Sequence, residues 1–306
     1  MIGIVTDDNA GFPEQEAKRL GIQVIQMPII INGQEYFENA NLTSEEFYRL
    51  QASNADISTS QPTPGAVKSI WRKALESCDS LVHIPMSSGL SKSMSTAKII
   101  ADEDEFKGRV FVADNHRISV TLRDSVYDAI ELAKQGRSAR EIVDYLDRTG
   151  HDSRIYIYVD TLKYLKKGGR ITPAAATMGQ ALHIKPVLKI EGGKLDAKAK
   201  ALGSKKAQQD LIDFIEDDLH GTFKAAADKL SFAMAYTGGP ADYLAACALR
   251  NRFAAAIGIP ANHILLDRLS LSVAVHIGPG AIATTITEVI SPKDIEAVAE
   301  REFHLA

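Results

Sequence analysis

The chain has 306 residues, 45% of them hydrophobic, and a formal net charge of −4. This length allows two domains, because single hydrophobic cores stop growing at roughly 250–300 residues. The slightly acidic balance argues against a nucleic-acid partner, whose phosphates require a basic protein face. The two cysteines, Cys78 and Cys247, give neither a disulfide framework nor metal-ligand spacing, so both are expected as reduced thiols.

The first half of the chain predicts strands that alternate with helices. Expected strands cover 2–5, 23–31, 81–86 and 110–113, and expected helices cover 14–20, 43–52, 64–78, 89–101, 119–135 and 138–149. This alternation is typical of a parallel sheet with helices on its faces. We therefore expect an N-terminal, Rossmann-like parallel α/β domain over residues 1–150.

Polar residues stand at two points where this domain could bind a ligand. Asp7 and Asp8 end the first strand, where they could line a site or cap the following turn. In the loop before residue 64, Thr63 can cap the next helix, which leaves the hydroxyls of Thr59 and Ser60 without a capping role. Those two hydroxyls are free to hold a ligand oxygen.

A serine-rich turn follows the strand at 81–86 and leads into the expected helix at 89–101. The start of a helix binds anions, because its backbone N–H groups are unpaired and its dipole favours negative charge. A carboxylate would suit Ser87, Ser88 and Ser91 in this position. The alternative is that one serine caps the helix and the others fill space.

The pattern changes after residue 150, where strands follow one another with turns between many of them. Expected strands cover 154–159, 184–190, 193–199, 230–236, 263–268 and 271–277, and a closing helix covers 291–303. Such runs predict an α+β domain with a mostly antiparallel sheet over residues 151–306. The boundary near 150 depends on this change alone.

One stretch of the second half contains closely spaced helix signals. A helix at 161–167 should end at a left-handed glycine in Gly168-Gly169, which presents Arg170 at a turn. Thr172 then caps a second helix that has Pro173 at its first position and extends to about residue 182.

His276 is expected at the end of a strand, just before the Gly278-Pro279-Gly280 turn. The glycine spacing fits a dinucleotide fingerprint, but Pro279 and the short tail that follows argue against that motif. A lone histidine is usually structural. Its place before this turn would also let it reach a ligand between the domains, together with Gly278.

Five motifs occur in an order that resembles the DegV family of bacterial fatty-acid-binding proteins. They are Ile4-Val-Thr-Asp7, Thr59-Ser-Gln-Pro62, Ser87-Ser-Gly-Leu-Ser91, the Tyr164-to-Ile171 run with its later Ile184-Lys-Pro-Val-Leu188, and His276-Ile-Gly-Pro-Gly280. The resemblance spans nearly the whole chain. It favours a ligand contact for His276.

The resemblance implies a binding protein that holds a long-chain fatty acid and hands it to a separate ATP-dependent kinase, which phosphorylates the carboxylate. Thr59, Ser60, Ser87, Ser88, Ser91, His276 and Gly278 would hold the ligand, and Arg170 would face the kinase or the phosphate. No cofactor and no metal are expected. The sequence shows no catalytic elbow, phosphate-binding loop or paired-histidine motif, which agrees with a non-catalytic subunit.

Two enzyme hypotheses remain open. The second domain of the family resembles part of dihydroxyacetone kinase, so His276 could be a nucleophile for a small carbonyl substrate, and a compact polar pocket would favour this. Ser88 or Ser91 could also be a hydrolase nucleophile with His276 as its base, but this arrangement lacks a third member.

Two features concern the site's detail and the protein's location. Lys92 stands where the family has glycine, and Asn115 where it has serine, which affects the expected carboxylate site. No signal-peptide pattern begins the chain, and the apolar segment 269–286 is broken by glycine and proline. We therefore expect a cytoplasmic protein with no stable membrane insertion.

Overall fold

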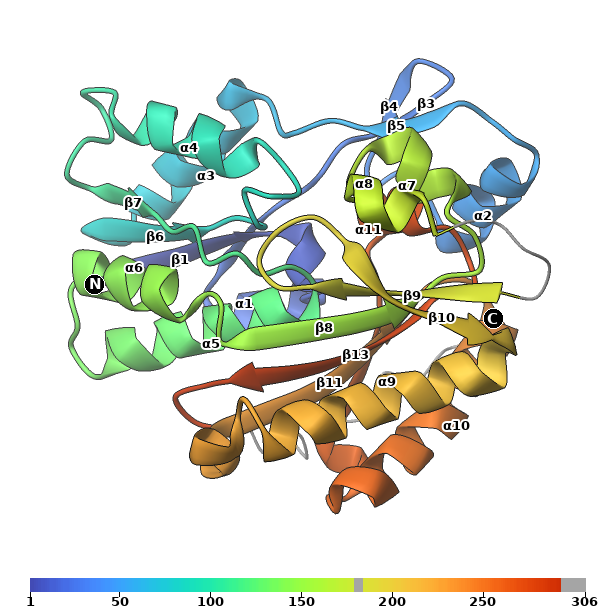
Figure 1. The fold of residues 1–306 in the computed structure, drawn as a ribbon. Helices are drawn as coiled ribbons and strands as arrows, with labels where there is room; N and C mark the ends of the chain where they lie inside the picture. The colour runs from blue at the N-terminus through green and yellow to red at the C-terminus, as the bar shows by residue number, and fades with distance from the viewer. Residues whose placement is uncertain (179–183, 293–306) are drawn as a thin grey trace.

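The computed structural model describes residues 1–178 and 184–292. Within them, a four-stranded, a six-stranded and a small three-stranded sheet are packed with helices around them (Figure 1). Three short 3₁₀ helices complete the described chain: η1 Asp8–Ala10, η2 Lys224–Lys229 and η3 Ala261–His263.

The four-stranded sheet is parallel and has the order β2-β1-β6-β7. Val5 and Leu81 pack in one core with α3 and α4, whereas Ile4 and Val82 pack on the other face with α5 and α6. The bounds are β1 Ile2–Asp7, α1 Glu14–Leu20, β2 Gln23–Ile25, α3 Pro64–Leu75, β6 Ser80–Ile84, α4 Ser93–Ala101, β7 Val110–Val112, α5 Val120–Lys134 and α6 Ala139–Thr149.

The three-stranded sheet is antiparallel and has the order β4-β3-β5. Asn32 and Gly33 join β3 to β4 with φ of 51° and 83°, the left-handed pair that a two-residue hairpin requires. The bounds are β3 Ile29–Ile31, β4 Gln34–Tyr36, α2 Ser44–Ala52 and β5 Ile57–Thr59. The side chain of Thr43 caps α2 by accepting from the Glu46 N–H.

The six-stranded sheet has the order β10-β9-β8-β13-β11-β12, and every neighbouring pair is antiparallel except β11 with β12. Helices α9 and α10 cover one face, where Tyr156, Tyr158 and Met234 pack. The bounds are β8 Ser153–Tyr158, α7 Lys163–Gly168, α8 Pro173–Ala176, β9 Ile184–Ile190, β10 Asp196–Leu202, α9 Gly203–His220, β11 Leu230–Tyr236, α10 Pro240–Ile257, β12 Leu265–Arg268, α11 Leu271–Ile277 and β13 Ile282–Glu288.

The opposite face of this sheet belongs to the same core as the parallel sheet. Ile155, Ile157 and Ala283 are buried in one cluster with Ile4 and Val82. The expected fold class, a parallel α/β part followed by a mostly antiparallel α+β part, is confirmed. The domain boundary near residue 150 falls between α6 and β8 and stays a prediction.

Several expected elements differ from the structure. The strand expected at 23–31 is two short strands, β2 and β3, which belong to different sheets. Residues 271–277 form α11 instead of a strand, and the strand β13 at Ile282–Glu288 was not expected. In α11, Leu271, Ala274 and Val275 meet the core of the small sheet, and this spacing of three and four residues is helical.

A further difference is the start of α4, which begins at Ser93 rather than near residue 89. The hydroxyls of Ser87 and Ser91 accept hydrogen bonds from the backbone N–H groups of Gly89 and Ser93, respectively, at 3.1 Å each. Such local hydrogen bonds compete with helix formation. The helix expected up to residue 182 ends at Ala176 in the structure, and residues 179–182 lie outside the described residues. Of the closing helix expected at 291–303, residues 291 and 292 are not helical and the others lie outside the described residues.

Candidate functional site

A largely apolar cavity lies between the two larger sheets. Its wall includes Met27 and Met86 beside the parallel sheet, and Ile155 and Ile157 from the six-stranded sheet. The space between the lining atoms, counted with its open mouth, is about 890 Å³. Most of the side chains that line the cavity are apolar, and a few polar ones stand among them, which suits a ligand with a long apolar part and a polar group.

Polar side chains gather where β5 meets α11. Thr59 ends β5 and His276 lies in the last turn of α11, and both line the cavity. The Thr59 hydroxyl and His276 Nε2 form a hydrogen bond of 2.8 Å. The direction of this bond depends on which ring nitrogen carries the proton. Ser60 lines the cavity beside Thr59.

His276 is held against α7 with its other nitrogen enclosed. A Cβ placed on Gly168 would lie 2.2 Å from His276 Nδ1, so the ring packs directly on the glycine backbone. Nδ1 has no hydrogen-bond partner among the residues that the structure describes. Burial, and next the positive charge of Arg170, lower the pKa of His276 to about 4. The ring is therefore neutral at neutral pH.

Arg170 is placed by the turn that the sequence predicted. Gly169 ends α7 with φ of 70°, and Thr172 caps α8 with Pro173 in its first turn, so both expected caps are confirmed. The guanidinium donates from Nε to the Leu90 carbonyl at 3.2 Å and from Nη1 to the Gly168 carbonyl. Arg170 lines the cavity.

The expected serines have different positions. Ser91 lines the cavity, and its hydroxyl bonds to that of Ser93 at 2.8 Å. Ser87 and Ser88 do not line it: the Ser87 hydroxyl donates to the Gly192 carbonyl at 2.7 Å, and the Ser88 N–H donates to Asp114. Ser87 thus joins the serine turn to the turn between β9 and β10.

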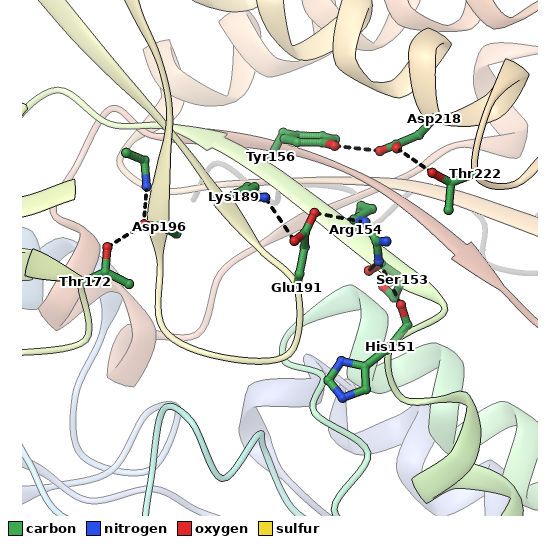
Figure 2. A network of polar contacts seen from close by, with 11 residues as sticks. His151, Ser153, Arg154, Tyr156, Thr172, Lys189, Glu191, Asp196, Asp218 and Thr222 are labelled. Carbon is green, nitrogen blue, oxygen red and sulfur yellow. Dashed lines mark hydrogen bonds and ion pairs between the residues drawn. The ribbon is translucent and has the colours of Figure 1, made fainter. Parts of the chain in front are cut away.

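The β9–β10 turn is itself fixed by charged side chains. Figure 2 shows Glu191 between Lys189 and Arg154, with ion pairs of 3.0 and 3.2 Å. A Cβ on Gly89 would lie 2.7 Å from the Gly193 Cα, so the two turns are in close contact. These contacts position Leu90 and Ser91 at the cavity.

Gly278 has a structural place in this arrangement. It follows α11 with φ of 80°, and a Cβ there would lie 2.3 Å from the ring of Tyr164. Its carbonyl accepts from the Thr237 hydroxyl at 2.6 Å. Gly278 does not line the cavity; it allows the chain to pass closely over α7.

Asp7 and Asp8 bind the backbone of neighbouring loops. Asp7 accepts from the Met86 N–H at 2.9 Å, and Asp8 accepts from the Met27 N–H at 2.8 Å. Both methionines line the cavity, although the two aspartates do not. Lys92 is the N-cap residue of α4 and also lies outside the cavity wall.

Four polar lining residues were not expected from the sequence: Gln61, Ser119, Ser272 and Thr285. Gln61 lies within the Thr59-to-Pro62 motif, which was a usable signal. Ser119 precedes α5 with φ of 58° and ψ of −137°, a strained backbone that no local pattern announces. Ser272 and Thr285 lie in the two elements whose type was wrong or missed.

Among residues 1–178 and 184–292, no group of three or more metal-ligand side chains could hold a metal ion. Over the same residues, every helix is too short or too polar to cross a membrane.

The fold and the cavity define an α/β protein with a largely apolar interior site and polar groups gathered at one part of its wall. Residues 1–289 match the family model described as "Uncharacterised protein, DegV family". The chain belongs to the DegV family, which confirms the resemblance seen in the motifs.

Relatives in this family align over nearly their full length. A DegV domain-containing protein of Deinococcus radiodurans is 32% identical over 289 residues, which cover 93% of this chain and 98% of the relative. One from Streptomyces coelicolor is 27% identical, covering 94% and 98%.

Two solved structures are also similar. One is described as fatty acid binding of a DegV family protein from Thermus thermophilus, with 30% identity, a TM-score of 0.83 and coverage of 94% of this chain and 99% of that one. The other is a fatty acid binding DegV family protein from Streptococcus agalactiae, with 26% identity, a TM-score of 0.81 and coverage of 94% and 99%.

Proposed function

We propose that this protein binds a long-chain fatty acid in the cavity. The observation that carries the proposal is the Thr59–His276 pair at the wall of an otherwise apolar space. The two relatives from Thermus thermophilus and Streptococcus agalactiae, described as fatty-acid-binding, support it. Each buried CH₂ contributes ~0.8 kcal/mol, so the acyl chain supplies affinity and the polar groups supply orientation.

The carboxylate is held by Thr59 and Ser91, with Ser60 beside them, and His276 orients the Thr59 hydroxyl. His276 is neutral and has one N–H to donate. If Nε2 donates to the Thr59 oxygen, the Thr59 hydroxyl can donate to the carboxylate. If Nδ1 carries the proton, Thr59 must donate to Nε2 and presents no hydrogen. A bound carboxylate therefore selects the Nε2–H tautomer, and Arg170 adds a nearby positive charge.

The binding role is tested by extracting lipid from the purified protein and identifying it by mass spectrometry. We expect one fatty acid per chain in the wild type and loss of most of it in a Thr59→Ala, Ser91→Ala, His276→Ala variant. Ser53→Ala, an exposed position, is the control. A wild-type protein that contains no fatty acid and takes none up from solution contradicts the proposal.

We further propose that the protein is a non-catalytic subunit of the bacterial cytoplasm that presents the acid to a separate ATP-dependent kinase and uses no cofactor. The carboxylate oxygen would attack the γ-phosphorus of ATP, and ADP would leave. Arg170 lies at the cavity wall and would face the kinase or the phosphate.

The test adds fatty-acid-loaded protein, ATP and hydroxylamine to a cell extract, because hydroxylamine converts an acyl phosphate into a stable hydroxamate. We expect hydroxamate to depend on all three additions, and Arg170→Gln to retain the acid but give less hydroxamate. Hydroxamate that forms without the extract would show instead that this chain is itself the kinase.

The geometry does not favour the two enzyme hypotheses. The small-carbonyl reading of His276 called for a compact polar pocket, whereas the wall is mostly apolar. The hydrolase hypothesis requires a hydrogen bond between His276 and Ser88 or Ser91. Instead, His276 bonds to Thr59, Ser91 bonds to Ser93, and Ser88 does not line the cavity.

A further inference from the structure

Ser272 places a hydroxyl in the cavity apart from the Thr59–His276 pair. It precedes His276 by four residues on α11, so the two side chains lie on one face of the helix, about 6 Å apart along its axis. Both line the cavity. If the carboxylate of a fatty acid lies at His276, the carboxyl-proximal half of its acyl chain can therefore pass Ser272.

The Ser272 hydroxyl belongs to a buried polar cluster. It bonds to Asn9 Oδ1 at 3.2 Å, and the hydroxyl of Ser270 bonds to the same oxygen at 3.1 Å. Asn9, Ser272 and Ser270 are 2%, 6% and 7% exposed. The amide nitrogen of Asn9 has no hydrogen-bond partner among the described residues. This nitrogen and the Oδ1 atom that accepts from Ser272 are bonded to the same carbon of the Asn9 side chain.

The unpaired group persists whichever way the Asn9 amide is oriented. Amide nitrogen and oxygen are interchangeable in shape, so the two orientations must be judged by their hydrogen bonds. With the oxygen toward the serines, two N–H donors are unpaired. With the nitrogen toward them, the carbonyl is unpaired. Buried polar groups in folded proteins nearly always have partners, so one is missing here.

We propose that Ser272 forms a second polar subsite of the cavity, which holds the hydroxyl of a hydroxylated long-chain fatty acid, and that Asn9, which bonds to Ser272 but does not line the cavity, orients the Ser272 hydroxyl. A ligand hydroxyl both donates and accepts, so it can pair with the Ser272 hydroxyl in either orientation of the Asn9 amide. A plain acyl chain offers Ser272 no polar partner. The inference extends the proposed fatty-acid function and depends on it. The competing occupant is an ordered water, which buried polar sites commonly hold.

The test measures dissociation constants by competition against one fluorescent fatty acid. The competitors are stearic acid, a hydroxystearic acid with its hydroxyl in the carboxyl-proximal half of the chain, and one with its hydroxyl near the methyl end. We expect the first hydroxy acid to bind about fivefold more tightly than stearic acid, as one buried hydrogen bond allows. The second should show no such gain.

Variants assign the effect to the cluster. Ser272→Ala and Asn9→Leu should each abolish the preference and still bind stearic acid. Ser153→Ala, which removes a buried hydroxyl bonded to Thr287 away from the cavity, should retain it. Thermal unfolding checks that the variants are folded. If Asn9→Leu does not fold, the result with Ser272→Ala decides the test by itself.

Each result has one meaning. Equal binding of the three acids overturns the inference, because water then satisfies the cluster, but leaves the fatty-acid function intact. A preference that persists in both variants also overturns it and places the hydroxyl elsewhere, for example at Ser119. Binding of none of the acids contradicts the proposed function itself.

Discussion

The imidazole of His276 rests on the backbone of Gly168, because a Cβ at Gly168 would lie 2.2 Å from Nδ1. The contact joins α11 to the end of α7, two helices separated by more than a hundred residues. It explains why a glycine stands inside the last turn of α7, where helix propensity alone would favour alanine. The same contact turns Nε2 toward Thr59.

Gly168→Ala is expected to weaken fatty-acid binding, because the added methyl group must displace the His276 ring from Thr59. The residue is in the helix, so alanine meets no backbone strain there, and a clash costs about 1–3 kcal/mol. We expect a loss of binding of roughly tenfold, measured with a fluorescent fatty acid.

Gly169→Ala is the matched control. Gly169 has φ of 70° and no atom within 4 Å of an added Cβ, so alanine strains the backbone without touching His276. This change should lower the free energy of unfolding by about 1 kcal/mol and leave the Thr59–His276 contact in place. Equal binding losses in both variants would contradict the role given to Gly168.

Acidification should destabilise the ligand-free protein through His276. Burial lowers the pKa of His276 to about 4, below its ordinary value of 6.5. As the pH falls from 6.5 toward 4, His276 binds a proton in the unfolded chain but not in the folded chain, so the free energy of unfolding falls. The loss is ~3 kcal/mol at most. Denaturant unfolding of wild type and His276→Gln across this range should show a weaker pH dependence in the variant.

Asp124 should have the opposite effect on the pH dependence of stability. Burial raises its pKa to about 7, and the Ser231 hydroxyl bonds to it at 3.1 Å. The folded chain therefore holds a proton that the unfolded chain releases above pH ~4, and the resulting stability is lost as the pH rises through 7. Asp124→Asn should be more stable than wild type at pH ~8, by on the order of 2 kcal/mol.

The gain from Asp124→Asn should shrink as the pH falls toward 4, because the wild-type carboxyl is then protonated and equally neutral. Unfolding curves at several pH values measure this. A gain that is independent of pH would show that Asp124 is not the titrating group. Because the two effects oppose each other, each single variant is compared with wild type at every pH.

Much of the fold was predictable because its signals are local. Alternating strands and helices and the Thr63 and Thr172 caps depend on a few neighbouring residues, and the structure has them. The segment at 271–277 was not predictable in this way. Leu271, Val273, Val275 and Ile277 alternate like a strand, and a short apolar run does not distinguish a strand from a buried helix.

The residues of the site also differ in whether a local sequence motif indicated them. Thr59, Ser60, Ser91, Arg170 and His276 come together at one wall of the cavity, and each belonged to a motif. The Ser272–Asn9 contact was not foreseen, because it joins residues 263 positions apart and depends on the register of the whole assembly. Ser87 and Gly278 also belonged to motifs, but they hold turns together rather than line the cavity.

The size of the cavity depends on two alanines in adjacent strands. Ala235 of β11 and Ala283 of β13 are register partners, and both line the cavity, so their small side chains leave a hollow in the sheet face. Leucine at Ala283 would fill part of this hollow with apolar atoms. Because the added atoms enter an open space, the fold should tolerate the change at a cost of about 1–3 kcal/mol or less.

We expect Ala283→Leu to shorten the acyl chain that the protein accepts. Long acids should lose affinity by tenfold or more, because the hollow no longer accommodates their CH₂ groups, each of which contributes ~0.8 kcal/mol when buried. Short acids should bind as they do to the wild type. Competition with saturated acids of increasing length measures both. Ala246→Leu is the control for overpacking alone, because Ala246 of α10 is buried in the core on the other face of the sheet. If the length preference is the same in wild type and in Ala283→Leu, the acyl chain does not pass over β13.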